Sequence, residues 1–187
     1  MPATGKSRFA EWLSGEMKLP YLSKDTVKEI LFDRVGFHSR TQKVALGNAA
    51  MEVLYYFAES HMRARNPFIL ENNFEDYSRD GMMELMKRYG YRPITVLFDG
   101  DTEVVYRRFI ARDQSPGRHR GHVVNTCFPE TGERPPYVPM GLETFRAGAE
   151  ERGFRRFSVG GSVIRVDCTE FEKVDYEQIC VRIRDAI

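Results

Sequence analysis

Residues 2–7 read Pro-Ala-Thr-Gly-Lys-Ser, and this short segment constrains the fold more than any other part of the sequence. Gly5, Lys6 and Ser7 end the pattern Gly-x-x-x-x-Gly-Lys-Ser/Thr, and Thr4 lies in the same loop. In such a loop the glycine lets backbone N–H groups face phosphates, the lysine neutralises their charge and the hydroxyl ligates magnesium. A helical pattern starting at Arg8 would point its positive end at the same anion. The segment therefore predicts a loop that binds nucleotide phosphates and Mg²⁺.

The phosphate-loop pattern is incomplete at its start. Its first glycine would lie one residue before Met1, and the strand that feeds such a loop would lie before that. A Gly-Lys-Ser/Thr triplet alone arises by chance in roughly one chain in ten of this length, so the flanking loop and helix give the motif its weight. Loss of a central strand would leave buried backbone groups unpaired. We therefore expect the natural protein to start upstream of Met1, with its first, central strand missing from this chain.

Short apolar runs alternate with segments of helical period along the rest of the chain. Such alternation predicts an α/β fold with a mostly parallel sheet covered by helices on both faces. The length of 187 residues, of which 42% are hydrophobic, fits one domain over residues 1–187. The predicted strands are 19–23, 68–71, 92–98 and 162–166, and the predicted helices are 8–15, one opening at 24, 41–65, 80–89, 102–112 and 174–187.

Two of the predicted helices carry more specific expectations. Asp25 is well placed to cap the helix that opens at Lys24. The long helix 41–65 should bury one apolar face. That face comprises Val44, Leu46, Ala50, Val53, Leu54 and Phe57.

Residues 113–139 have no clear period and are rich in glycine, proline, arginine and histidine. A structureless stretch of this length inside a compact domain is usually functional. Positive charge gathers here and on the preceding helix, and guanidinium groups stabilise a phosphoryl group in transfer. The alternative is a solvated basic face, which fits Arg107 and Arg108 better.

With these segments in order, the chain resembles the stand-alone AAA-type kinases related to zeta toxin, chloramphenicol phosphotransferase and the polynucleotide kinases. The resemblance covers nearly the whole chain. It implies a three-layer P-loop kinase fold, with ATP and Mg²⁺ as cofactors and residues 113–139 as a lid over ATP. It rests on Pro-Ala-Thr-Gly-Lys-Ser, Leu-Ser-Lys-Asp-Thr-Val-Lys, Ile-Leu-Glu-Asn-Asn-Phe and the Arg/His-rich segment.

The resemblance places an acceptor site beside two predicted strand ends. Asp25 would orient the acceptor hydroxyl and accept its proton, although a plain helix cap is the alternative. Lys28 would attract an anionic substrate or else be a solvated lysine. Glu71 would hold a magnesium-bound water or contact substrate with Asn73, because ligands gather at the carboxyl ends of strands. The alternative for Glu71 is a strand-end turn.

The resemblance also assigns roles at the lid and after the last strand. Arg112 and Arg118 are the main predicted phosphate contacts and, with Lys6 and Asp25, the predicted catalytic residues. His122 would support the lid or the substrate. Thr169 would lie near the adenine, with a turn-and-cap role as the alternative.

Composition narrows the function further. The net charge is +1, from 28 basic and 27 acidic side chains, so a chain-wide basic excess for coating nucleic acid is absent. Three cysteines without a CxxC pair argue for reduced thiols in a cytoplasmic protein, and no apolar run predicts a membrane span.

We expect an ATP-dependent kinase that transfers the γ-phosphoryl group to a hydroxyl of a small molecule, sugar nucleotide or nucleic acid end. The nucleic acid end is the less favoured acceptor. The alternatives are a nucleotide-binding ATPase or regulatory protein without an acceptor, and a truncated inactive remnant. The sequence names neither the acceptor nor the oligomeric state.

Overall fold

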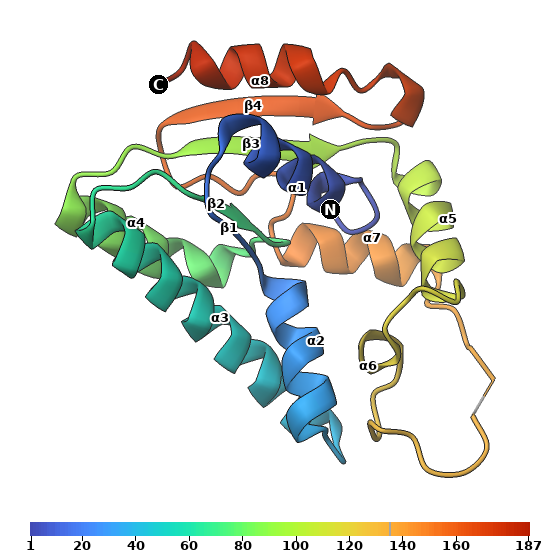
Figure 1. Cartoon of the computed structure of the whole chain (residues 1–187). Helices are drawn as coiled ribbons and strands as arrows, with labels where there is room; N and C mark the ends of the chain where they lie inside the picture. Colours follow the sequence, from blue (N-terminus) through green and yellow to red (C-terminus); the bar gives the residue numbers. More distant parts are fainter. Residues whose placement is uncertain (135) are drawn as a thin grey trace.

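A computed structural model describes residues 1–134 and 136–187 of the chain. Helices and parallel strands alternate in it, as the sequence predicts (Figure 1). Two short 3₁₀ turns lie at Asp76–Ser78 and Phe171–Lys173. The main elements are α1 (Lys6–Met17), β1 (Tyr21–Ser23), α2 (Lys24–Val35), α3 (Arg40–Arg63), β2 (Ile69–Glu71), α4 (Arg79–Tyr89), β3 (Ile94–Asp99), α5 (Thr102–Asp113), α6 (Arg120–Val123), α7 (Leu142–Glu151), β4 (Ser162–Asp167) and α8 (Tyr176–Arg184).

The strands form two parallel pairs. β1 pairs with β2, with Ser23 opposite Glu71, and β3 pairs with β4, with Asp99 opposite Asp167. Within the described residues these pairs are separate two-stranded sheets, whereas the sequence predicted one sheet without its central strand. Both pairs end in polar side chains at the carboxyl end. This is the edge at which ligands of parallel α/β folds gather.

α1 is fixed by the largest part of the core. Phe9 and Leu13 pack with Phe98 of β3 and with Ile164 of β4, and the rings of Phe9 and Phe98 lie 5.3 Å apart. In Figure 1 α8 runs along β4 and adds its apolar face, which includes Ile179, to the same cluster. This packing sets the position of the N-terminus of α1.

The buried face of α3 differs from the prediction. Val44 and Val53, expected inside, are 46% and 42% exposed. The prediction placed all of these apolar residues on the buried face. The face that α3 buries against α2 and α4 is narrower than that. The residues of α3 that are buried are Lys43, Ala50, Met51, Leu54, Ala58 and Met62.

The segment expected to lack structure is partly ordered, and one helix was missed. α6 lies within residues 113–139, and Phe37 and Phe128 form an antiparallel bridge there. α7 buries Phe145 and Ala149 against Val105 of α5. Leu142, Phe145 and Ala149 recur at helical spacing and are the sequence signal for α7.

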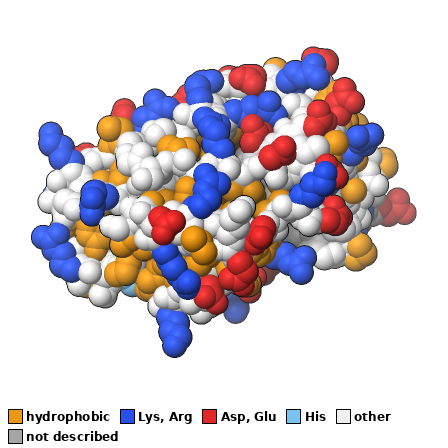
Figure 2. Space-filling view, turned by 90° about the horizontal axis from the view of Figure 1, so that it is seen from above, with side chains coloured by type: hydrophobic (Ala, Val, Ile, Leu, Met, Phe, Trp, Pro, Cys, Tyr) orange, Lys and Arg blue, Asp and Glu red, His pale blue; other side chains and the backbone are white. Residues whose placement is uncertain are grey.

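The surface carries charges of both signs. Figure 2 shows Lys and Arg side chains interspersed with Asp and Glu over the face seen from above. This agrees with the near-zero net charge. Among the described residues, every helix is too short or too polar to cross a bilayer.

Candidate active site

The N-terminus of α1 has no side-chain cap. Gly5 precedes the helix at φ +81°, a left-handed conformation that glycine adopts without strain, and it offers no side-chain cap. The first backbone hydrogen bond of the helix runs from the Phe9 N–H to the Gly5 oxygen at 3.1 Å. The earlier amides of a helix have no partner within it, and the Ser7 side chain is exposed beside them. Thr4 instead is buried, and its hydroxyl donates to the Met1 oxygen at 2.8 Å.

Lys6 points from this helix end toward β2. Its Nζ donates to the Met1 oxygen at 3.1 Å and lies 3.6 Å from Glu71 Oε1. Burial lowers the pKa of Lys6, while Glu71 and Asp25 oppose that change. The contact places the predicted phosphate-binding lysine and the predicted acidic residue side by side.

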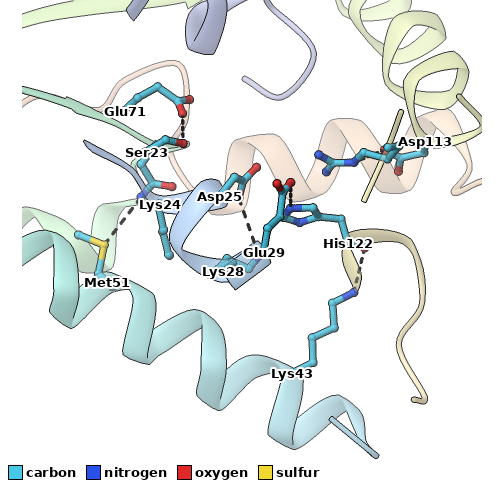
Figure 3. Close-up of polar contacts among 12 residues, drawn as sticks. Ser23, Lys24, Asp25, Lys28, Glu29, Lys43, Met51, Glu71, Asp113 and His122 are labelled. Atoms are coloured by element: carbon cyan, nitrogen blue, oxygen red, sulfur yellow. Dashed lines mark hydrogen bonds and ion pairs between the residues drawn. The ribbon is translucent and has the colours of Figure 1, made fainter. Parts of the chain in front are cut away.

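Glu71 is held by the strand next to it. Parallel pairing sets Ser23 directly opposite, and the Ser23 hydroxyl donates to Glu71 Oε2 at 2.7 Å (Figure 3). The expectation that Asp25 caps α2 is wrong, because Ser23 is the N-cap residue and the Asp25 carboxylate lies within the first turn. The Ser23 hydroxyl makes no cap bond, since it is committed to Glu71.

Asp25 is an accessible carboxylate among cations. Its side chain is 42% exposed, and Oδ1 lies 4.0 Å from Lys28 Nζ. Desolvation raises the pKa of Asp25, but His122, Lys28, Arg118 and Lys6 together outweigh it, and the net pKa is lowered. Asp25 is therefore ionised at neutral pH.

His122 reaches the same region from α6. Its side chain is 5% exposed, and its Nε2 lies 2.9 Å from Glu29 Oε1 of α2. Desolvation lowers the pKa of His122 to about 3, with Asp25 opposing, so the ring is neutral and its Nε2–H donates to Glu29. Figure 3 shows Asp25, Glu29 and His122 converging from the two helices.

The two predicted phosphate-binding arginines share one carboxylate. Arg112 Nη2 and Arg118 Nε lie 3.3 Å and 3.4 Å from Asp113 Oδ1. The Nε atoms of both arginines are buried without a hydrogen-bond partner among the described residues. Arg118 also lines a cavity of about 520 Å³ together with Arg120, Arg134 and Tyr137. A ligand that accepts hydrogen bonds would satisfy these donors.

Thr169 lies in a tightly bonded loop after β4. Its hydroxyl donates to Asp167 Oδ1 at 2.6 Å and accepts from the Asp101 N–H at 2.8 Å, which favours the turn-and-cap alternative. Its role near the adenine stays a prediction.

Arg108 was missed by the sequence analysis, which placed it on a solvated face. Its guanidinium donates to the backbone oxygens of Cys168 and Thr169 and stacks 3.7 Å from the centre of the Phe171 ring. A Cβ on Gly5 would stand 3.3 Å from this ring. Arg108 therefore holds the loop after β4 against the N-terminus of α1. The sequence signal for such a role is the position of Arg108 one helical turn before Arg112.

Two predictions about the site remain, the substrate contact at Asn73 and the metal ligands Ser7 and Glu71. The Asn73 Oδ1 is buried without a hydrogen-bond partner among the described residues. The described residues contain no group of three or more His, Cys, Asp or Glu side chains arranged for a metal ion. Ser7 and Glu71 would therefore hold Mg²⁺ only together with oxygens of a bound nucleotide.

Comparisons with known proteins identify the family and the fold of the chain. The AAA domain family model matches residues 1–126. A solved structure from Chloroflexus aurantiacus J-10-fl, described as a "putative kinase", superposes over 100% of this chain and 94% of its own, with 29% sequence identity and a TM-score of 0.82. No curated protein matches the sequence.

Proposed function

Because the chain belongs to the AAA domain family, we propose that it is an ATP-dependent kinase that transfers the γ-phosphoryl group to a hydroxyl. One observation carries the proposal: Lys6 of the phosphate loop lies 3.6 Å from Glu71 at a strand end, and its charge acts on Asp25. A lysine for phosphate, an acidic residue for magnesium and a carboxylate for the acceptor thus meet at one edge of the fold.

The residues at the N-terminus of α1 fit a bound triphosphate. The free amides after Gly5 and the positive end of the helix favour anions, and the Lys6 ammonium adds a mobile charge. Ser7 and Glu71 would complete the coordination of Mg²⁺, which neutralises charge on the phosphates when it is bound. Phe171, held by Arg108 beside Gly5, gives the nucleotide base an apolar surface.

Asp25 is suited to orienting the acceptor. As an ionised carboxylate it would accept a hydrogen bond from the acceptor hydroxyl and hold that oxygen in line for transfer. Its lowered pKa makes it a weak base, so orientation contributes more than early proton removal. The acceptor site would be lined by Lys28, Asn73 and His122.

The lid arginines would stabilise the charge that spreads over the transferred group. The Nε atoms of Arg112 and Arg118, which make no hydrogen bond within the described part of the chain, are donors suited to phosphate oxygens. Asp113 holds the two guanidinium groups near each other without satisfying them fully. We favour a small molecule or sugar nucleotide as the acceptor over a nucleic acid end.

Transfer from γ-labelled ATP tests the proposal. The protein is incubated with Mg-ATP and a panel of hydroxyl acceptors, and labelled products are separated. Lys6→Met and Asp25→Asn should abolish the labelled product, while Lys87→Met, an exposed lysine on α4, should not. ATP consumption that no acceptor changes would point to an ATPase, and absence of Mg-ATP binding would point to an inactive protein.

A further inference from the structure

Lys43 is a buried lysine for which the proposed reaction has no role. It lies near the start of α3, and 7% of its surface is exposed. Burying an ammonium group is costly unless polar partners surround it. An aliphatic side chain would fill the same space without that cost. The groups that bond to Lys43 therefore indicate what a lysine does at this position.

The Lys43 ammonium group bonds to the lid. Its Nζ donates to the backbone oxygen of His122 at 2.9 Å, to that of Val124, and to Asn125 Oδ1 at 3.1 Å. Arg40 on α3 donates to the same Asn125 oxygen at 2.8 Å. Figure 3 shows the Lys43 side chain reaching from α3 to the segment that carries His122. These bonds join α3 to the end of α6.

Apolar contacts support the same junction. Phe32 of α2 is fully buried, and Gly121 of α6 lies so close that a Cβ there would stand 2.4 Å from Phe32 Cδ2. Phe37 and Phe128 exchange two backbone hydrogen bonds of 2.8 Å. The lid segment 119–128 therefore packs on α2 and on the start of α3.

This segment and the residue before it bring two side chains to the proposed acceptor site. His122 donates to Glu29, which follows Asp25 by one helical turn on the same face of α2. Arg118 immediately precedes the segment, and its charge lowers the pKa of Asp25. The position of segment 119–128 thus sets where the Arg118 guanidinium and the neutral His122 ring lie relative to Asp25.

We propose that Lys43 is a positioning residue that fastens lid segment 119–128 to α3 and so holds Arg118 and His122 beside Asp25. The inference rests on the proposed function, because Asp25 orients the acceptor there. In this arrangement α2, α3 and the later part of the lid form one acceptor-side unit.

The anchor depends on charge and therefore on pH. Burial, with Lys28, Arg40 and Arg118 nearby, lowers the pKa of Lys43 to about 8, while Asp113 raises it. A lowered pKa means that the bonded Lys43 favours the neutral amine over the ammonium, and the neutral amine still donates hydrogen bonds, so the anchor tightens as pH rises from about 8 toward the ordinary 10.5. The charged or titratable groups around it are Lys28 of α2, Arg40 of α3, Asp113 at the end of α5, and Arg118 and His122 of the lid.

Hydrogen exchange and NMR on the whole protein without nucleotide test the anchor. The variants are Lys43→Met, Lys43→Arg and the matched control Lys87→Met. In Lys43→Met, loss of charged hydrogen bonds should speed exchange of amides 119–128 about tenfold or more, while β3 and β4 stay unchanged. The His122 ring should then titrate near its ordinary pKa of 6.5 instead of about 3.

A pH series on the wild-type protein gives an independent readout. After correction for intrinsic exchange, protection of amides 119–128 should rise between the Lys43 pKa of about 8 and the ordinary 10.5, because the exposed lysine of the open segment binds more protons in that range. Lys43→Arg should show no such rise, because a guanidinium stays charged. If Lys43→Met does not fold, this series decides.

Two results would overturn the inference. One is unchanged protection of segment 119–128 in Lys43→Met with His122 still neutral. The other is wild-type protection that stays level or falls between pH 8 and 10.5. If the wild-type protein fails to bind Mg-ATP, the proposed function falls, and the exchange data still decide whether Lys43 is the anchor.

Discussion

The ammonium nitrogen of Lys6 lies 3.6 Å from Glu71 Oε1, which joins the first turn of α1 to the carboxyl end of β2. Each side chain also makes a second contact. Lys6 is bonded to the Met1 oxygen, and Glu71 is held by Ser23. In the proposed reaction a triphosphate would draw Lys6 away from Glu71 and leave that carboxylate for Mg²⁺. The predictions below follow from this relationship and from the lid beside it.

Lys6→Met should weaken Mg-ATP binding about tenfold to a hundredfold, because a hydrogen bond from a charged donor contributes roughly 1.5 to 3 kcal/mol. Isothermal titration calorimetry measures the change, with Lys87→Met as the matched control. Equal affinity for Lys6→Met and the wild-type protein would remove Lys6 from the phosphate site.

Asp25→Asn should lower the rate of phosphoryl transfer by a factor of about 10² to 10⁴ while Mg-ATP affinity stays near that of the wild type. The pH dependence has a definite sign. A lowered pKa keeps Asp25 ionised until the pH falls below its ordinary value of 3.8. The transfer rate should therefore not fall between pH 8 and pH 5 through protonation of Asp25. A fall in rate within this range that disappears in Asp25→Asn would contradict the assignment.

Lys43 should make stability rise with pH on the alkaline side. Its folded pKa of about 8 lies below the ordinary 10.5, so between these values the unfolded chain binds more protons and unfolding becomes less favourable as pH rises. The rise amounts to at most about 3 kcal/mol. Urea unfolding at pH 7 and pH 10 should show it in the wild type and not in Lys43→Met. Parallel curves for both proteins would refute it.

Gly121→Ala should destabilise the protein by about 1 to 3 kcal/mol, because the added methyl group would overlap the Phe32 ring. The control is Gly117→Ala, a position where a Cβ meets nothing within 4 Å. Denaturant midpoints measure both changes. Similar midpoints for the two variants would mean that α6 does not pack tightly on Phe32.

The order of elements and the candidate site could be read from sequence because both are local patterns. The loop before α1 and the polar residues after β2 are short motifs whose positions follow from strand and helix periodicity. The family match and the superposition confirm the predicted family and fold class. The roles of individual site residues stay predictions.

The contacts between distant segments could not be read in that way. The predicted buried face included Val44 and left out Lys43, because their burial depends on where segment 119–128 and α2 pack against α3. Arg108 looked solvated for the same reason, since its partners lie after β4. Such burial depends on tertiary packing, which the hydrophobic period of a single helix does not report.

Titration of ¹⁵N-labelled protein with Mg-ATP, followed by NMR, tests the central claim most directly. The account predicts saturable binding with the largest shifts at the backbone amides of Gly5, Lys6 and Ser7 and at the Lys6 Nζ. Binding that leaves these signals unmoved, or no binding at all, would contradict it.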